Sequence, residues 1–340
     1  MKSIYTLPGA LLLSLCGNGQ QQPHYSQYML NQYILNPALT GIENYTDIKV
    51  SHRHQWVGID GAPVTTYLTA HMPLGKEDFR TSSTGFHIPG ENPRGKAYWE
   101  SYTAAEPHHG IGLQMINDKT GPLNRFSGYL TYAYHIGISA KTSLAAGFGA
   151  GVSNLRLNTN KLDFGIVTPV DPAVFENRSL NYFKPDFNAG LYLYSADYFL
   201  GLSAQQIIPQ KIKFSDNEVT PSEGKLVPHL FATAGYRFLL SDEFNLLPSV
   251  MLKYIRPLPV QADLNAKLQY LDLLWCGLSY RTGEGFAAML GLNISNAINV
   301  GYAYDYTTTK LNTVSKGTHE LMIGFIIGNK YGSWCPKNVW

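Results

Sequence analysis

The sequence predicts an all-β protein: a transmembrane antiparallel β-barrel of about 14 strands, of the outer-membrane type. Polar and apolar residues alternate with a period of two in many segments. Hydrophobic residues make up 44% of the chain and charged residues only 15%, against roughly 25% charged in a soluble globular protein. Beyond the N-terminus, no stretch reaches the 18 or so consecutive apolar residues that a spanning helix needs. These observations favour strands with one face in lipid.

The alternation is clearest toward the C-terminus. In residues 260–270 (VQADLNAKLQY), every second side chain from Val260 to Tyr270 is apolar. On a helix these residues would be spread around the whole circumference, whereas on a strand they form one face. Residues 274–281, 288–295 and 298–307 repeat the pattern. Four consecutive strands are therefore expected to present one apolar and one more polar face.

Ten further strands are expected upstream and downstream of this run. They lie near residues 46–58, 63–74, 109–117, 123–137, 142–155, 185–195, 197–207, 228–239, 244–256 and 318–328. Their lengths suit tilted strands that cross a bilayer, and an even number lets the sheet close with both ends on the periplasmic side. Tyrosines gather near the strand ends, as in an interfacial girdle: Tyr132, Tyr134, Tyr236, Tyr270, Tyr280 and Tyr306.

Connection lengths predict an orientation. With a periplasmic start, the short connections near 195–197, 240–243, 270–272 and 295–297 are periplasmic, and the long ones at 157–184 and 208–227 face outside. Outer-membrane barrels show this asymmetry. Residues 75–108 are an exception, because they form a long connection on the periplasmic side. They are a docking element, an inward-folded plug, or a sign that the strand count is wrong by one.

Four regions follow from this pattern. Residues 1–19 resemble a secretory signal peptide, with Lys2 before a short apolar stretch and small residues near Gly19. Residues 20–45 are expected at the periplasmic mouth or inside the lumen, because they are rich in Tyr, Asn and Gln. Residues 46–328 form the barrel and 329–340 a C-terminal tail. Cys276 is expected on the lipid face and Cys335 in the tail, so we expect no disulfide between them.

The scarce charges are expected to face inward. By alternation, Asp186 and ten candidate lumen-facing residues lie on the inner wall: Lys49, Arg53, Arg125, Arg237, Lys253, Asp263, Lys267, Arg281, Asp305 and Glu320. A barrel of this size leaves more room than side chains fill. Mixed signs favour ion pairs across the lumen, or contacts to an inserted segment, over a selectivity ring of one sign. A solvated inner wall explains them equally well.

Other functional classes find little support. A net charge of +2 provides no basic field for nucleic acid. The glycines of GFGAG, residues 147–151, alternate with apolar residues as on a strand, unlike a phosphate-binding loop. His52 and His54 share a strand face without a third metal ligand, and His108 and His109 are expected in a solvent-exposed loop. We therefore expect no cofactor-binding or metal site.

An enzymatic barrel is also considered. A lipid hydrolase would need a serine nucleophile with a histidine base at the outer rim. His135 and His229 are expected to face inward, and no GxSxG motif is present. We therefore expect no catalytic residues.

Several strings resemble one family. They are YSQYMLNQYILNPALTG at 25–41, RHQWVGIDGAPVTTYLTAHMPL at 53–74, NDKTGP at 117–122, and the later LKYIRPLPVQADLNAKLQY, SYRTG, GYAYDYT and GTHELMI. In order and spacing, from about residue 22 to 328, they resemble the PorP/SprF family of type IX secretion outer-membrane proteins. The resemblance implies a barrel in the outer membrane of a Gram-negative bacterium.

The resemblance also implies partners. SprF-like members serve the export or surface attachment of gliding adhesins that carry a C-terminal sorting domain, while PorP-like members work with periplasmic parts of the machinery. We therefore expect a non-enzymatic secretion component whose partner is such an adhesin, periplasmic components, or both, within outer-membrane lipid. The alternative is a porin or transport barrel for small solutes.

Overall fold

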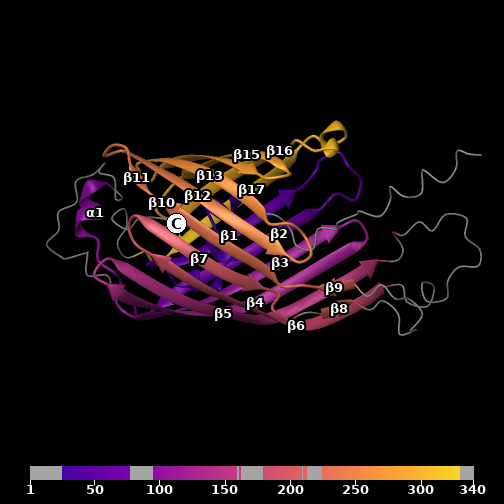
Figure 1. Cartoon of the computed structure of the whole chain (residues 1–340), viewed down its shortest axis with the longest axis horizontal. Coiled ribbons are helices and arrows are strands. Elements are labelled where there is room, and N and C mark those ends of the chain that lie inside the picture. Colours follow the sequence, from indigo (N-terminus) through magenta and orange to yellow (C-terminus); the bar gives the residue numbers. More distant parts are fainter. Residues whose placement is uncertain are drawn as a thin grey trace, which may run out of the picture.

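The computed structural model describes residues 25–76, 95–158, 161, 179–208, 210–212 and 224–329. Within them, one antiparallel sheet closes on itself (Figure 1). Its strands are β1 Thr46–His54, β2 Val64–Leu74, β3 His108–Thr120, β4 Leu123–Ser139, β5 Thr142–Asn158, β6 Ser179–Tyr194, β7 Tyr198–Gln205, β10 His229–Tyr236, β11 Phe238–Leu239, β12 Phe244–Ile255, β13 Gln261–Tyr270, β14 Leu274–Arg281, β15 Gly285–Asn293, β16 Ile298–Thr307 and β17 Thr318–Ile327.

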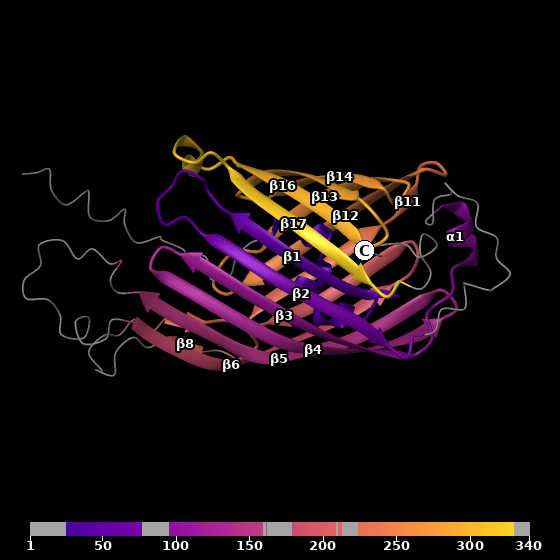
Figure 2. The same cartoon turned by 180° about the vertical axis from the view of Figure 1, so that it is seen from behind.

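Two pairings close the ring. β1 pairs with β17, as Figure 2 shows from behind, and β10 pairs with β12. The sheet has 15 strands, but the two-residue β11 continues β10 past Arg237 and pairs with the same neighbour. Fourteen strands therefore surround the lumen, which confirms the expected barrel. Because the sheet closes, the backbone N–H and C=O groups of every strand edge find partners within the barrel, which lipid could not provide.

Some strand boundaries differ from expectation. The first strand ends at His54 rather than near residue 58, because Trp56 and Gly58 have φ angles of 49° and 101° and turn the chain. The connection expected as a loop at 208–227 contains a short hairpin, β8 Gln210–Ile212 and β9 Gly224–Leu226. The strand expected at 185–195 begins earlier, at Ser179.

The two faces of the wall separate as alternation predicts. Leu264, Leu278 and Leu290 are 53%, 67% and 50% exposed, whereas Ser279 and Met289 are only 3% and 4% exposed. Cys276 is likewise exposed, with a free thiol. Among the expected girdle tyrosines, Tyr134, Tyr236, Tyr280 and Tyr306 are exposed on the outer face. None of the helices in the described ranges is long and apolar enough to cross a membrane.

The barrel has two unlike ends. At the turn end, β1 begins and β17 ends. The short connections at this end are 140–141, 195–197, 240–243, 271–273 and 294–297. The loop end has the longer connections 55–63, 159–178, 206–228 and 308–317, the last with η5 Lys310–Thr313, and the short connections 121–122, 256–260 and 282–284. The segment joining β2 to β3 is at the turn end, where α1 Lys96–Ser101 is seen in both views. The strand count is thus not wrong by one.

The first described residues lie inside the ring. Residues 25–45, the lumen segment, form three short 3-10 helices: η1 Ser26–Met29, η2 Gln32–Ile34 and η3 Pro37–Leu39. Every residue from Tyr25 to Glu43 is buried. Figures 1 and 2 show this indigo segment enclosed by the strands. The expected signal peptide, 1–19, and residues 330–340 of the tail lie outside the described residues.

The lumen segment passes so close to the wall that some positions admit no side chain. A Cβ on Gly147 of β5 would lie 2.5 Å from the Pro37 carbonyl oxygen, and one on Gly110 of β3 would lie 1.9 Å from that of Thr40. Both contacts are with backbone, which cannot rotate away. GFGAG is thus a strand whose glycines face inward, and at Gly147 a glycine is required by the segment that packs on it.

We predict that Gly147→Ala lowers the thermal unfolding temperature of the barrel in detergent, at a cost of about 1–3 kcal/mol for overpacking. The matched control is Gly128→Ala on β4, where the nearest atom to the added Cβ is 3.8 Å away. This control should unfold at the wild-type temperature or slightly above it, because alanine reduces the freedom of the unfolded chain. Equal unfolding temperatures for Gly147→Ala and the wild type would contradict the close packing.

Candidate functional site

The candidate site is the interior of the barrel, where the wall holds the lumen segment by its backbone. Gln114 Nε2 of β3 donates to the Tyr33 carbonyl at 2.6 Å, and Ser203 Oγ and Gln205 Nε2 of β7 donate to that of Leu35 at 2.7 and 3.0 Å. Short 3-10 helices leave carbonyls without internal partners, which a buried segment must satisfy elsewhere. Inward-facing polar side chains of the strands meet this need.

Side chains of the lumen segment reciprocate. Asn31 Nδ2 donates to Thr69 Oγ1 at 2.9 Å, and Asn36 Nδ2 donates to the Leu191 carbonyl at 3.0 Å. Asn265 Nδ2 donates to the Tyr28 hydroxyl at 2.6 Å. The segment is thus bound to strands on several sides of the ring.

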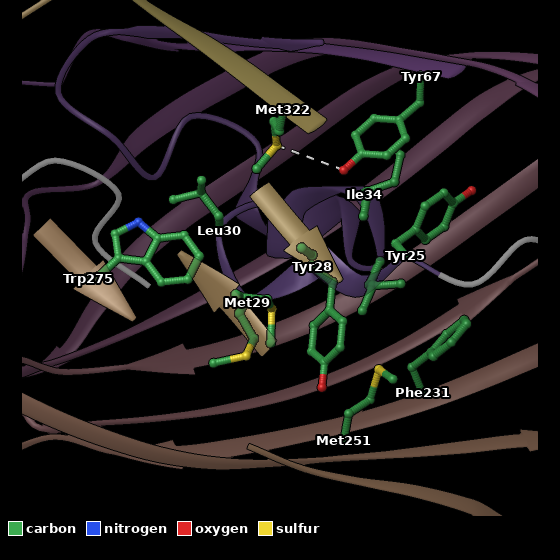
Figure 3. Packing of buried hydrophobic residues seen from close by; sticks show 13 residues of the cluster. Tyr25, Tyr28, Met29, Leu30, Ile34, Tyr67, Phe231, Met251, Trp275 and Met322 are labelled. Atoms are coloured by element: carbon green, nitrogen blue, oxygen red, sulfur yellow. Dashed lines mark hydrogen bonds between the residues drawn. The ribbon is translucent and has the colours of Figure 1, made fainter. Parts of the chain in front are cut away.

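An apolar cluster packs the same segment against the wall. Tyr28, Met29 and Leu30 meet inward-facing Trp275 and Met322 (Figure 3). The full cluster is Tyr25, Tyr28, Met29, Leu30, Ile34, Leu35, Tyr67, Phe231, Met251, Trp275, Met289, Ala303 and Met322. These side chains would be unfavourable on the wall of a water-filled channel. Here they form a hydrophobic core within the lumen.

Near the loop end, Ser26 joins a group of buried charges, which we call the Ser26 cluster: Ser26, Arg53, Asp263, Arg281, Asp305 and Glu320. The Ser26 backbone N–H donates to Glu320 Oε2 at 2.8 Å, and its hydroxyl donates to Asp305 Oδ2 at 2.6 Å. Arg53 and Arg281 both donate to the Ser26 hydroxyl oxygen. Ser26 is therefore the residue by which the lumen segment enters a charge network.

Ion pairs within the cluster join strands that are adjacent in the ring or separated by one strand. Arg53 of β1 lies 2.7 Å from Asp305 of β16 and 3.1 Å from Glu320 of β17. Arg281 of β14 lies 3.1 Å from Asp305 and 3.3 Å from Asp263 of β13. These strands form one continuous arc of the ring. Of the two arrangements expected for mixed inward charges, this cluster shows the contacts to an inserted segment, made through Ser26, and its ion pairs lie within one arc of strands.

The other predicted inward charges lie elsewhere on the inner wall, and of these Lys253 is close enough to interact with Asp263 and Arg281 of the cluster. Lys49 pairs with Asp47 on its own strand. Arg237 Nη1 donates to the Ala196 carbonyl at 3.0 Å, at the turn end, and Lys267 Nζ lies 6.0 Å from the centre of the Trp275 ring. Lys253 is 5% exposed, and Arg125 lines a small pocket together with Tyr25 of the lumen segment, so both side chains lie inside the barrel. Asp186 accepts a bond from Tyr129 Oη at 2.6 Å.

The histidines correct one expectation. His108 is not in an exposed loop: it begins β3, is 1% exposed, and stacks on His135 with ring centres 4.5 Å apart. His135 Nε2 donates to the Thr40 carbonyl at 2.8 Å, and a His108 ring nitrogen lies 3.2 Å from that of Gly41. The pair therefore holds the lumen segment near the turn end. His109 is exposed, as expected, but it too lies in β3 rather than in a loop.

The described residues contain no group of His, Cys, Asp and Glu arranged to hold a metal ion. His52 is exposed and its Nδ1 lies 2.9 Å from Thr66 Oγ1. His135, considered as a catalytic base, contacts a backbone carbonyl and the Tyr194 hydroxyl, 3.0 Å away, rather than a serine.

A pocket of about 110 Å³ lies at the loop end, which we call the mouth pocket. Arg53, Arg281 and Asp305 of the Ser26 cluster line it, together with Trp56, Glu284 and Leu311. Two pockets beside the lumen segment are far smaller, about 10 and 20 Å³. Such volumes suit a water molecule rather than a solute path. The lumen segment thus fills much of the width that fourteen strands enclose.

A family model described as type IX secretion system membrane protein PorP/SprF matches residues 17–325. The chain belongs to the PorP/SprF family. With the closed barrel, this membership supports an outer-membrane protein that spans the membrane many times and is a component of type IX secretion. A search of curated proteins found no match.

Among solved structures, this chain resembles the CymD monoaromatic hydrocarbon channel, with 12% identity and a TM-score of 0.51 over 88% of this chain and 92% of that one. The Ralstonia pickettii toluene transporter TbuX matches with 10% identity and a TM-score of 0.44 over 86% and 92%. The Acinetobacter baumannii outer membrane protein Omp33 matches with 8% and 0.44 over 85% and 100%. The CymD match shows a shared fold alone.

Sequence reasoning on this PorP/SprF chain missed the apolar part of the site. Trp275, Met289 and Met322 occupy inward positions and pack on the lumen segment. A signal existed, because the alternation itself places Trp275 and Met289 among the residues opposite the lipid face. Large apolar side chains on both faces of a strand indicate that both faces are covered. Ser26 carried no such signal, because its partners are far away in the sequence.

We predict that Arg53→Met destabilises the folded barrel by about 3 kcal/mol, because it leaves Glu320 and Asp305 buried without one of their cationic partners. Glu320 is 0% exposed, so water cannot replace the guanidinium. Urea unfolding of the detergent-solubilised protein measures the change. The matched control, Arg156→Met, removes an exposed arginine of β5 and should alter the unfolding free energy by less than about 0.5 kcal/mol. A similar loss in both variants would refute the role of the cluster.

Proposed function

We propose that this protein is a non-enzymatic component of type IX secretion that supports the export or surface attachment of a secreted adhesin with a C-terminal sorting domain, of the gliding-motility type. The observation that carries the proposal is the occupied lumen. Family membership supports a role in secretion, and a barrel filled by its own chain suits binding at its ends better than free diffusion through it. The loops and turns then supply the contact surfaces.

Periplasmic components of the machinery are the second class of partner we propose. The turn end offers the segment between β2 and β3, which is longer than the other turns there. Its described part includes α1, where the Trp99 carbonyl accepts a bond from Lys141 Nζ of the β4–β5 turn at 3.3 Å. A docking element is therefore the alternative we favour for residues 75–108.

Deleting the gene tests the adhesin. We expect one large sorting-domain protein to disappear from the surface of intact cells, measured by limited surface proteolysis and mass spectrometry. Recovery of that protein in the periplasm would indicate a role in export, and its release into the medium a role in attachment. Complementation with the wild-type gene is the control. An unchanged set of surface proteins would overturn the proposal.

The alternative is a porin for small solutes, which the shared fold with a channel brings into consideration. We predict that the purified full chain, placed in planar lipid bilayers, shows no steady open conductance steps, because the lumen segment occupies the path. A variant lacking residues 25–41, checked for folding by its heat-modifiable gel mobility, serves as the comparison and should conduct. Uniform open steps from the full chain would favour the porin.

A further inference from the structure

The outward face of the barrel wall carries very little charge. On each strand that surrounds the lumen, alternate residues turn to the lipid side. Within the described ranges of these strands, only two of the outward positions hold an Asp, Glu, Lys or Arg side chain. They are Lys119 of β3 and Arg156 of β5, and both are exposed. The outward positions of the described strands therefore hold two cations and no carboxylate.

The two cations lie near one another at the same end of the barrel. Lys119 is the residue before the last of β3, and Arg156 is two residues before the end of β5, so both are near the loop end. The register pairs Lys119 with Asn124 of β4, and Asn124 with Arg156. Because adjacent strands lie about 4.8 Å apart, the two backbones are separated by about 10 Å on one face. Their long side chains can therefore converge on a ligand placed over Asn124.

Neither cation forms an ion pair within the part of the chain that the structure describes. The carboxylate nearest in sequence, Asp118, faces inward and accepts a hydrogen bond from Thr65 Oγ1 at 2.6 Å. The residue between the two cations, Asn124, is a neutral amide that can donate hydrogen bonds. This surface thus offers donors and positive charge to a ligand that carries negative charge.

The cations stand at one boundary of the apolar band. Met115 on β3 and Val152 on β5 are outward residues nearer the turn end, and both are apolar and exposed. A charged side chain costs far more at the bilayer midplane than near an interface, which suits this position. At the turn-end boundary the outward side chains are aromatic, for example Phe244 and Tyr270, whose ring centres are 4.9 Å apart. Among the described strands, cations therefore mark the loop-end boundary alone.

We propose that Lys119 and Arg156 bind a phosphate group of an outer-leaflet glycolipid of the lipid A type. Four connections at the loop end are long, which assigns this end to the cell surface. The glycolipids that form the outer leaflet of a Gram-negative outer membrane carry phosphate on their head groups. Phosphate oxygens accept short, charge-assisted hydrogen bonds from Arg and Lys. The site is on the outer wall, so it is separate from the lumen segment and from any secreted or periplasmic partner.

Native mass spectrometry of the purified full chain in detergent micelles tests the site. The probes are diphosphoryl lipid A and the same lipid A with both phosphates removed. We expect the double variant Lys119→Met, Arg156→Met to bind diphosphoryl lipid A about 25-fold more weakly than the wild type. Each cation near an anionic lipid surface contributes roughly a factor of five, so each single variant should lose about fivefold. The dephosphorylated lipid should bind both proteins equally weakly.

The matched control is Lys96→Met, Lys310→Met, which removes two exposed cations from α1 and η5 and should bind the lipid like the wild type. Heat-modifiable gel mobility shows that each variant is folded. Equal retention of diphosphoryl lipid A by the double variant and the wild type would overturn the proposal, as would an equal loss in the control. Phosphatidylglycerol that competes as well as lipid A would overturn the assignment to a glycolipid. Because the measurement needs no secretion partner, failure of this inference and failure of the adhesin role can be told apart.

Discussion

The structure depends on one constraint: fourteen closed strands enclose more space than their own side chains fill. Such a barrel either holds water or holds protein. Here it holds residues 25–45, and the requirements of that segment determine the inner wall. Its irregular backbone needs donors, which Gln114, Ser203 and Gln205 supply. Its apolar side chains need partners, which Trp275 and Met322 supply. The inner face is therefore neither a uniform polar lining nor a uniform core.

The same constraint explains the use of charge. An unpaired charge in this interior would lack water, so the cluster at Ser26 sets two guanidiniums among three carboxylates within one arc of strands. Adjacent strands hold their side chains at fixed separations, as for Arg53 with Glu320 and Arg281 with Asp263, and the long arginine side chains also reach Asp305 one strand further on. Ser26 adds a neutral hydroxyl that contacts both signs. Buried charges of both signs are thus gathered around Ser26, near the loop end of the barrel.

Much of the fold could be predicted because alternation is a local signal. The number of strands, their faces and the exposure of Cys276 follow from residues that are adjacent in the sequence. Exceptions occur where a distant contact decides. The strand expected across 228–239 is interrupted at Arg237. Its backbone N–H donates to the Asp197 carbonyl at 2.6 Å, and its guanidinium donates to the Ala196 carbonyl. No pattern near Arg237 indicates this.

The interior site was predictable only in part, for the same reason. Alternation identifies which charges turn inward, but it does not tell which of them meet: Arg53 and Glu320 are separated by most of the chain and become neighbours only because β1 closes on β17. His108 shows the effect most clearly. Its stacking on His135 and its contact with Gly41 join three regions that no local pattern relates. The sequence offered two alternatives for residues 20–45, and long-range pairing places their described part in the lumen.

A filled lumen also bears on how such a barrel works. A solute channel needs a continuous polar path with weak binding along it, whereas here wall and segment are joined by hydrogen bonds, apolar packing and a charge cluster from one end to the other. Glycines at positions 110 and 147 bring the two backbones into contact, so the segment fits as part of the fold. The surfaces left for recognition are then the two ends of the barrel. Their connecting segments differ in length and composition, and they face opposite sides of the membrane. The proposed contacts, with an exported partner on one side and secretion components on the other, fit such an asymmetry.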